Sequence, residues 1–484
     1  FGVDYIELGW PMSSKVIFDS FNICEKIRKN SKIVAFGSTS ITKNPEEDKN
    51  LRAILETGVK YACIFGKSSA EHVEKQLKIS KEENLDKILR SVKFLKENGL
   101  HVFYDAEHYF DAFKTDKEYA IETLSAAIKG RAERIILCDT NGGILPNEAE
   151  KIIRETKEKF PNVIFGVHFH NDSGLALANT LVCLPYINQV QGTINGIGER
   201  VGNLNFSEFL PIYIKKMKRE LKIDLRNLKE INEEAFRLSG ISIPESRAFV
   251  GNTSFAHKGG IHVDAVSKGA SYEHENPEDF GNKRTTLFNT LGGKSSVLEI
   301  AKEFGFLLDK KNPETLKKIE NLFNELRNYE KRGYHLSAIK AEQFLLIEKY
   351  FGNLKNFFEI IEWKVESLMK DGKEKSKFYV KMKINGDICE DEMIVDGGPV
   401  DAAYKTINNL LVQKYPQIKD LKLFDFHVSI ARSKREESTV RTLISFKDGE
   451  DFETVGVDKN IITSAIEALS KGFNYYLNKK EKPI

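Results

Sequence analysis

The chain lacks several features that would place it in a class at once. Its five cysteines are scattered without a CxxC pair, which argues against a disulfide framework and a thiolate zinc site. Its longest apolar runs, such as 33–36, are too short to span a bilayer, and no signal-peptide pattern opens the sequence. We therefore expect a cytoplasmic protein with reduced thiols and no membrane partner.

Charge of one sign is not in excess either. Lys plus Arg number 73 and Asp plus Glu number 71, so the formal net charge is +2. This balance gives no reason to expect nucleic acid or an anionic membrane as a partner. With 41% hydrophobic and 30% charged residues among 484, the composition is that of a globular chain. Its length corresponds to roughly two to four domains.

A strand–turn–helix pattern repeats from residue 3 to about 200. Several of the expected strands are continuous apolar runs, as strands covered on both faces are. Ser80 and Glu83 form a capping-box pattern at the start of one intervening helix. The expected strands cover 4–8, 32–37, 61–66, 101–106, 134–139, 163–170 and 189–194.

Seven strands in a βα series favour a (β/α)8 TIM barrel whose first strand is missing from this chain, since Phe1 directly precedes an expected strand. A doubly wound open sheet is the alternative. Polar residues stand at the C-terminal end of nearly every expected strand, whereas an open sheet gathers its ligands near one switch point. We therefore favour the barrel. These residues are Glu7, Lys67, Glu107, Asp139, His168, His170 and Asn195.

The repeat stops near residue 208, and different patterns follow. We expect the barrel over 1–235, helical linker subdomains over 236–354 and a small α+β domain over 355–484. In the last domain, alternating strands at 377–384, 424–430 and 440–446 mix with helices near 399–413 and 459–477, which suggests two similar halves. The irregular stretch 242–294 is long enough to suggest a functional role.

The strongest chemical signal is His168-Phe169-His170-Asn171-Asp172. Residues i and i+2 of a strand share one face, so both imidazoles should project into the barrel mouth. Two imidazoles on one face suit a divalent metal. The glycine-rich stretch 192–203 ends in Asn203, whose amide oxygen either completes the metal shell or only shapes a turn.

Two further strand ends carry polar groups. Asp105 and Glu107 lie together before His108, and carboxylates are common proton handlers, although acidic strand ends also serve as helix N-caps. Thr140, after the strand 134–139, either hydrogen-bonds a substrate carboxylate or shapes a turn. The stretch 255–264 contains His257 and His262 and suggests either a site element carried by a loop or a surface turn.

Taken together, these segments resemble the citramalate, isopropylmalate and homocitrate synthase family. The resemblance covers essentially the whole chain, in the family's order, and its details look most like the citramalate-forming branch. The matching segments are the strand that contains His168, the glycine-rich loop 192–203, the stretch 255–266 and the late stretch 397–407.

The resemblance implies roles for individual residues. His168, His170 and Asn203 match metal ligands, and the metal is Mg, Mn or Zn. Glu107 matches a catalytic glutamate near the keto acid, and Thr140 a residue that contacts its carboxylate, and we expect Asp105 to bind substrate as well. His262 matches a catalytic histidine that reaches the site from the partner subunit and assists enolisation of acetyl-CoA. These residues are catalytic Glu107 and His262, substrate-binding Thr140 and Asp105, and metal-binding His168, His170 and Asn203.

One family feature is not present in the sequence. The family opens with a Thr-Leu-Arg-Asp-Gly type motif whose Asp binds the metal, and nothing of this kind precedes Phe1. We therefore expect the polypeptide as written to lack one metal ligand and to be inactive alone.

The function implied is a Claisen-type condensation of acetyl-CoA with pyruvate to give (R)-citramalate and CoA, in isoleucine biosynthesis. A homodimer and a branched-chain amino-acid effector bound by the last domain are implied too. The alternatives are isopropylmalate or homocitrate synthase, a related lyase, and a non-catalytic amino-acid sensor.

Overall fold

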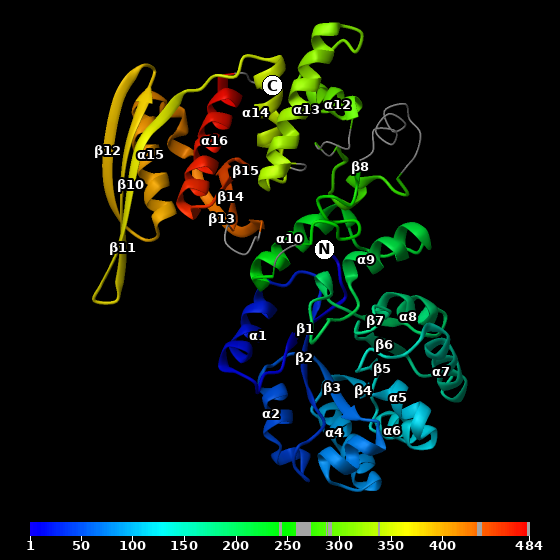
Figure 1. Cartoon of the computed structure of the whole chain (residues 1–484). Helices are drawn as coiled ribbons and strands as arrows, with labels where there is room; N and C mark the ends of the chain where they lie inside the picture. The colour runs from blue at the N-terminus through cyan, green and yellow to red at the C-terminus, as the bar shows by residue number, and fades with distance from the viewer. Residues whose placement is uncertain are drawn as a thin grey trace. The chain divides into compact units, whose positions relative to one another are not determined.

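The computed structural model describes residues 1–241, 244–257, 273–286, 288, 293–336, 339–432 and 438–481. The chain forms two compact units (Figure 1). The first unit contains residues 1–254 and 276–283, and the second contains 255–275 and 284–484. Within the described ranges, no helix combines the length and apolar character needed to cross a membrane.

The first unit is built on one parallel sheet whose seven strands pair in the order of the chain. A doubly wound sheet reverses its strand order at a switch point, and this sheet does not, so the barrel-type interpretation holds. The expected strands are all present, although the sixth and seventh are shorter than expected. The strands are β1 (Tyr5–Gly9), β2 (Lys32–Ser38), β3 (Tyr61–Lys67), β4 (His101–Glu107), β5 (Arg134–Asp139), β6 (Phe165–Phe169) and β7 (Gln189–Gln191).

Contacts between distant strands show that this sheet is strongly curled. The Gln191 amide nitrogen on β7 lies 3.3 Å from the Asp105 carboxylate on β4 and 3.8 Å from Cys63 Sγ on β3. Adjacent strands are about 4.8 Å apart, so in a flat sheet β7 and β3 would be separated by roughly 19 Å. The curled sheet therefore encloses an interior in which side chains of β3, β4 and β7 meet.

Helices and short helical turns connect the strands. The capping box expected at the start of α4 is formed, since Ser80 Oγ accepts from the Glu83 amide at 3.1 Å and Glu83 accepts from the Ser80 amide at 2.9 Å. The α-helices are α1 (Lys15–Ile27), α2 (Lys49–Glu56), α3 (Ala70–His72), α4 (Lys81–Glu97), α5 (Tyr109–Thr115), α6 (Lys117–Lys129), α7 (Pro146–Lys159), α8 (Ala176–Cys183), α9 (Phe206–Pro211) and α10 (Leu228–Ser239).

Short 3-10 and π-helical turns complete the first unit. One of them, η4, contains Asn195 with a φ of 64° and belongs to the glycine-rich loop. The turns are η1 (Pro45–Glu47), η2 (Val73–Leu77), η3 (Leu184–Tyr186), η4 (Ile194–Gly196), η5 (Ile212–Lys216), η6 (Leu225–Asn227) and η7 (Pro277–Phe280).

The second unit begins with a small parallel pair of strands and a group of helices. A core of apolar side chains, among them Val297, Ile319 and Ile347, holds the three helices together. The elements are β8 (Ala256–His257), β9 (Thr285–Thr286), α12 (Gly293–Glu303), α13 (Pro313–Arg332) and α14 (Lys340–Phe351).

The remainder of the second unit repeats one motif twice, as the sequence suggested. Each copy has a three-stranded antiparallel sheet followed by a long helix. Phe378 of the first sheet, Ile407 of the first helix and Phe473 of the second helix belong to one shared core. The elements are β10 (Phe358–Lys370), β11 (Lys373–Ile384), β12 (Asp387–Asp396), α15 (Pro399–Lys414), η8 (Pro416–Asp420), β13 (Lys422–Arg432), β14 (Thr439–Asp448), β15 (Glu450–Asp458) and α16 (Ile461–Glu481).

Candidate active site

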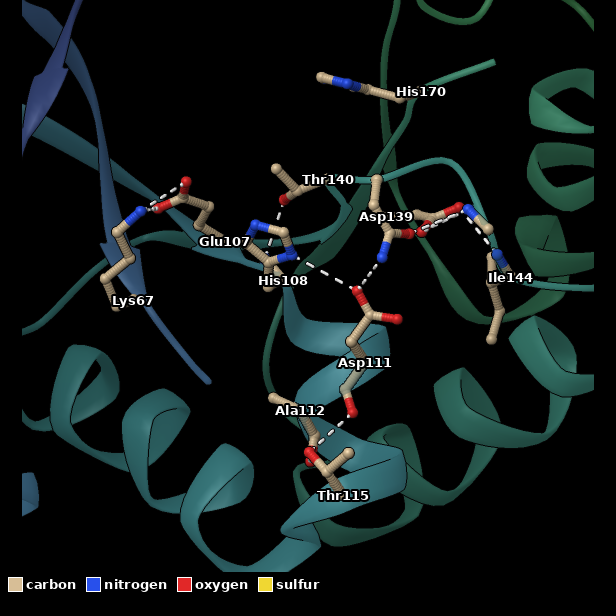
Figure 2. Close-up of polar contacts among 12 residues, drawn as sticks. Lys67, Glu107, His108, Asp111, Ala112, Thr115, Asp139, Thr140, Ile144 and His170 are labelled. Atoms are coloured by element: carbon tan, nitrogen blue, oxygen red, sulfur yellow. Dashed lines mark hydrogen bonds and ion pairs between the residues drawn. The ribbon is translucent and has the colours of Figure 1, made fainter. Parts of the chain in front are cut away.

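The C-terminal ends of β3 to β6 bring most of the expected site residues to one edge of the curled sheet. Lys67 ends β3, Glu107 ends β4 and Asp139 ends β5, while His168 is the fourth residue of β6. Figure 2 shows Lys67, Glu107, Thr140 and His170 above helix α5. Because parallel strands all end at the same edge, the barrel topology itself collects these groups.

Lys67 and Glu107 form an ion pair at this edge (Figure 2). The two residues are direct neighbours in the register of β3 and β4. Lys67 Nζ lies 2.8 Å from each Glu107 carboxylate oxygen, and the side chains are only 12% and 19% exposed. The carboxylate of Glu107 is thereby held in one place beside a fixed positive charge.

The turn after β4 is fixed by Thr140. His108 adopts a left-handed conformation with a φ of 58°, and its amide donates to Thr140 Oγ1 at 2.8 Å. Asp111 Oδ2 accepts from the Asn141 side chain at 2.7 Å and lies 3.4 Å from His108 Nδ1. Thr140 accepts a hydrogen bond from this turn, so its own hydroxyl hydrogen can donate to a ligand.

His168 is held in a defined state by its neighbour on β7. Its Nδ1 lies 2.8 Å from Gln191 Oε1, which can only accept, so Nδ1 carries the hydrogen and Nε2 keeps its lone pair. Burial, and then the charge of His170, lowers the pKa of His168 to about 4. The ring is therefore neutral at physiological pH, which is the form that binds a metal.

Asn203 lies beside this lone pair. An isolated antiparallel bridge joins His170 to Asn203, so the end of the glycine-rich loop lies against the extension of β6. Asn203 Nδ2 is 3.5 Å from His168 Nε2, and Asn203 Oδ1 is buried without a hydrogen-bond partner. Since a buried polar atom without a partner is costly, this oxygen is suited to bind a ligand.

His170 has a different environment. Its ring centroid lies 5.1 Å from that of His168, as expected for residues i and i+2 on one face. Arg200 Nη2 lies 2.6 Å from His170 Nδ1, and the same guanidinium makes a bidentate pair with Asp172. Burial and the charge of Arg200 lower the pKa of His170. A guanidinium can only donate, so the single lone pair of the neutral ring is already engaged.

These contacts show which lone pairs the expected metal ligands present. His168 Nε2 and Asn203 Oδ1 present lone pairs that fit a divalent cation, whereas His170 would first have to exchange Arg200 for the metal. Within the described part of the chain, no three His, Cys, Asp or Glu side chains are grouped so as to hold a metal. His262 lies outside the described residues.

Asp105 lies below the site, in the interior of the curled sheet. It is 6% exposed, and its Oδ1 accepts from Cys63 Sγ at 3.0 Å and from Gln191 Nε2 at 3.3 Å. Burial raises the pKa of Asp105 to about 6. Sequence reasoning did not single out Gln191 or Arg200, although Gln191 ends a strand, the position that identified the other residues.

Comparison with known proteins gives a consistent result along the chain. Residues 1–234 match an HMGL-like family model, residues 249–331 a homocitrate synthase post-HMGL domain-like model and residues 338–477 a LeuA allosteric (dimerisation) domain model. These ranges follow the order that the sequence resemblance implied.

Relatives with curated functions cover nearly the full length. The chain is 40% identical to an (R)-citramalate synthase of Geobacter sulfurreducens, over 99% of this chain and 92% of the relative. It is 39% identical to an (R)-citramalate synthase of Aquifex aeolicus, over 100% of this chain and 92% of the relative. A 2-isopropylmalate synthase of Methanocaldococcus jannaschii is 28% identical, over 99% of this chain and 89% of the relative. The chain therefore belongs to the (R)-citramalate synthase family.

Proposed function

We propose that this chain condenses acetyl-CoA with pyruvate to form (R)-citramalate and CoA, at the C-terminal edge of the β1–β7 sheet. The observation that carries the proposal is that the His168 Nε2 lone pair lies next to the Asn203 amide, whose Oδ1 is unpartnered, at the same sheet edge as the Lys67–Glu107 pair. Full-length identity of 40% to an (R)-citramalate synthase supports this substrate choice over that of isopropylmalate or homocitrate synthases.

His168 Nε2, Asn203 Oδ1 and, after release from Arg200, His170 would hold a divalent cation. When bound there, the cation would act as a Lewis acid toward the keto group of pyruvate. Hard oxygen donors together with imidazole suit Mg, Mn or Zn. The Thr140 hydroxyl would donate to the pyruvate carboxylate, because it accepts from the His108 amide while its own hydrogen remains available.

The reaction needs a proton acceptor, a proton donor and a water molecule. The methyl group of acetyl-CoA loses a proton to a base. By resemblance to the family, His262 reaches the site from the partner subunit and assists this step. The resulting carbon forms a bond to the keto carbon of pyruvate, whose oxygen takes up a proton. Water then cleaves the thioester to release CoA and a carboxylate. Glu107, held by Lys67, is positioned to handle protons next to the keto acid.

Keto-acid specificity gives a direct test. Turnover of the native gene product is compared with pyruvate, 2-ketoisovalerate and 2-ketoglutarate, and the condensation products are identified by mass spectrometry. The proposal expects clear preference for pyruvate. Preference for either larger keto acid would reassign the chain within the family, and amino-acid binding without any turnover would favour a sensor.

We further propose that the second unit forms a homodimer and binds a branched-chain amino acid. Its match to a dimerisation domain supports the dimer, as do exposed apolar residues of β13, namely Phe424 at 55%, Phe426 at 46% and Ile430 at 66%. The double substitution F424D/F426D should yield monomers in sedimentation analysis, whereas Leu307→Asp, at an 89% exposed site of the same unit, should not. Calorimetry with isoleucine and leucine tests the effector.

A further inference from the structure

We propose that Gln191, oriented by Asp105, is a positioning residue that fixes the tautomer of His168 and so keeps Nε2 free as a metal-binding lone pair. The inference deepens the proposed function, because it rests on a metal bound at His168. It gives Asp105 a role through Gln191, in place of the direct contact with substrate that the sequence suggested.

The first step is the contact between Gln191 and His168. The two residues are register partners on the adjacent strands β7 and β6, so their side chains lie side by side. Gln191 Oε1 lies 2.8 Å from His168 Nδ1, which is the distance of a good hydrogen bond. With an oxygen at this position, only the tautomer with the hydrogen on Nδ1 makes the bond.

The second step explains why Gln191 presents oxygen rather than nitrogen. The other end of the amide lies 3.3 Å from Asp105 Oδ1, and an ionised carboxylate can only accept. A flipped amide would direct its oxygen at this carboxylate and its NH2 group at His168. Asp105 therefore selects the amide orientation, and the amide selects the tautomer.

The third step is that Asp105 is itself fixed. The residue is 6% exposed, and its Oδ1 also accepts from Cys63 Sγ at 3.0 Å. Cys63, Asp105, Gln191 and His168 come from β3, β4, β7 and β6, so the curl of the sheet sets the geometry of the whole chain of contacts. Side chains that hydrogen-bond a metal-binding histidine without touching the metal orient its ring, and their loss typically weakens metal affinity about 10–100-fold.

A set of three variants tests the inference by metal affinity, measured as Mn²⁺ binding to the metal-free protein. Gln191→Met keeps the length of the side chain but removes the acceptor, and we expect affinity to fall about 10–100-fold. The double substitution Gln191→Glu/Asp105→Asn keeps an acceptor against His168 Nδ1 and gives the second carboxylate oxygen an amide donor, so it should bind nearly as tightly as the wild type. Gln189→Met is the matched control on the same face of β7, because Gln189 Oε1 is buried without a partner.

A second readout needs neither metal nor substrate. In ¹⁵N-histidine spectra of the metal-free wild type, the His168 signals, assigned by their loss in His168→Gln, should show a protonated Nδ1 and an unprotonated Nε2. In Gln191→Met the other tautomer should gain population. This readout applies even if the variant binds metal poorly because its fold is weakened.

The outcomes separate this inference from the proposed function. Unchanged affinity in Gln191→Met, equal loss in Gln191→Glu/Asp105→Asn, equal loss in Gln189→Met or a wild-type His168 protonated on Nε2 would each overturn the inference. A wild type with the expected tautomer that fails to use pyruvate would overturn only the proposed function.

Discussion

Lys67 Nζ lies 2.8 Å from both carboxylate oxygens of Glu107, at the shared edge of β3 and β4. Both side chains are more than four-fifths buried, so neither charge can be satisfied by bulk water if the other is removed. The carboxylate assigned to proton handling thus depends on one lysine for its position and charge.

Lys67→Met should therefore lower kcat about 10²-fold or more, the usual contribution of a positioned proton-handling side chain, because Glu107 loses its cation. Lys75→Met is the matched control, since Lys75 pairs with Glu71 at 2.8 Å on an exposed helix surface. Steady-state kinetics with pyruvate give the comparison. A kcat for Lys67→Met equal to that of Lys75→Met would show that Glu107 works without the lysine.

Much of the first unit could be predicted because its signals are local. Apolar runs located the seven strands, the Ser80–Glu83 pattern located a helix start, and the i, i+2 spacing placed His168 and His170 on one face. The contact between Gln191 and Asp105 could not be predicted, since it joins residues 86 apart that meet only because the sheet curls.

The position of Arg200 shows a second limit. Its contact with His170 depends on the path of the glycine-rich loop, where Arg200 itself has a φ of 55°. Between residues 355 and 484, three strands were predicted and six are present among the described residues. The missed strand β12 has exposed Glu390 and Glu392 between Ile388 and Ile394, so its outward face gives little hydrophobic signal. The residue boundaries of the expected domains and the active-site roles stay predictions.

Asp105 should make stability depend on pH in a specific direction. Burial raises its pKa from 3.8 to about 6, and the acidic groups Glu107 and Glu7 face it. Between these values the folded state binds more protons than the unfolded state, so the free energy of unfolding falls as pH rises. Asp105→Asn removes this dependence.

The free energy of unfolding of D105N minus that of the wild type should increase by up to about 3 kcal/mol between pH 4 and pH 8. Urea unfolding of metal-free protein at the two pH values measures it. Asp86→Asn, at a side chain 62% exposed, is the control and should follow the wild type. A D105N curve parallel to the wild type would show that Asp105 is not a perturbed buried acid.

Arg200 should compete with the metal. Its guanidinium occupies His170 Nδ1 at 2.6 Å and places a positive charge next to the site. Arg200→Met removes both effects, so the Mn²⁺ affinity of the metal-free protein should rise about tenfold. The free-energy change that corresponds to this rise is a modest part of the repulsion between two neighbouring positive charges. Arg90→Met, which breaks a surface pair with Asp86, should leave affinity unchanged. Weaker binding in Arg200→Met would mean that Arg200 supports the site instead.

Lys471 should be the main polar support of the second unit. Its Nζ lies 3.3 Å from Glu342 Oε2 and 3.2 Å from Glu467 Oε1, and Glu342 is 3% exposed. Lys471→Met leaves Glu342 buried without its cation and should lower the free energy of unfolding by about 3–5 kcal/mol. Lys405→Met breaks only an exposed i,i+4 pair with Asp401, and about 0.5 kcal/mol is expected. Chemical denaturation compares the two, and similar losses would refute the role of Lys471.

The most direct measurement is the formation of citramalate from acetyl-CoA and pyruvate by the native gene product, with and without a chelator, in the wild type and in His168→Ala. We expect citramalate only from the wild type with metal, because the lone pair that Gln191 orients on His168 is lost in the variant. Equal rates for the wild type and His168→Ala, or a wild-type rate that the chelator does not change, would contradict a metal site at His168.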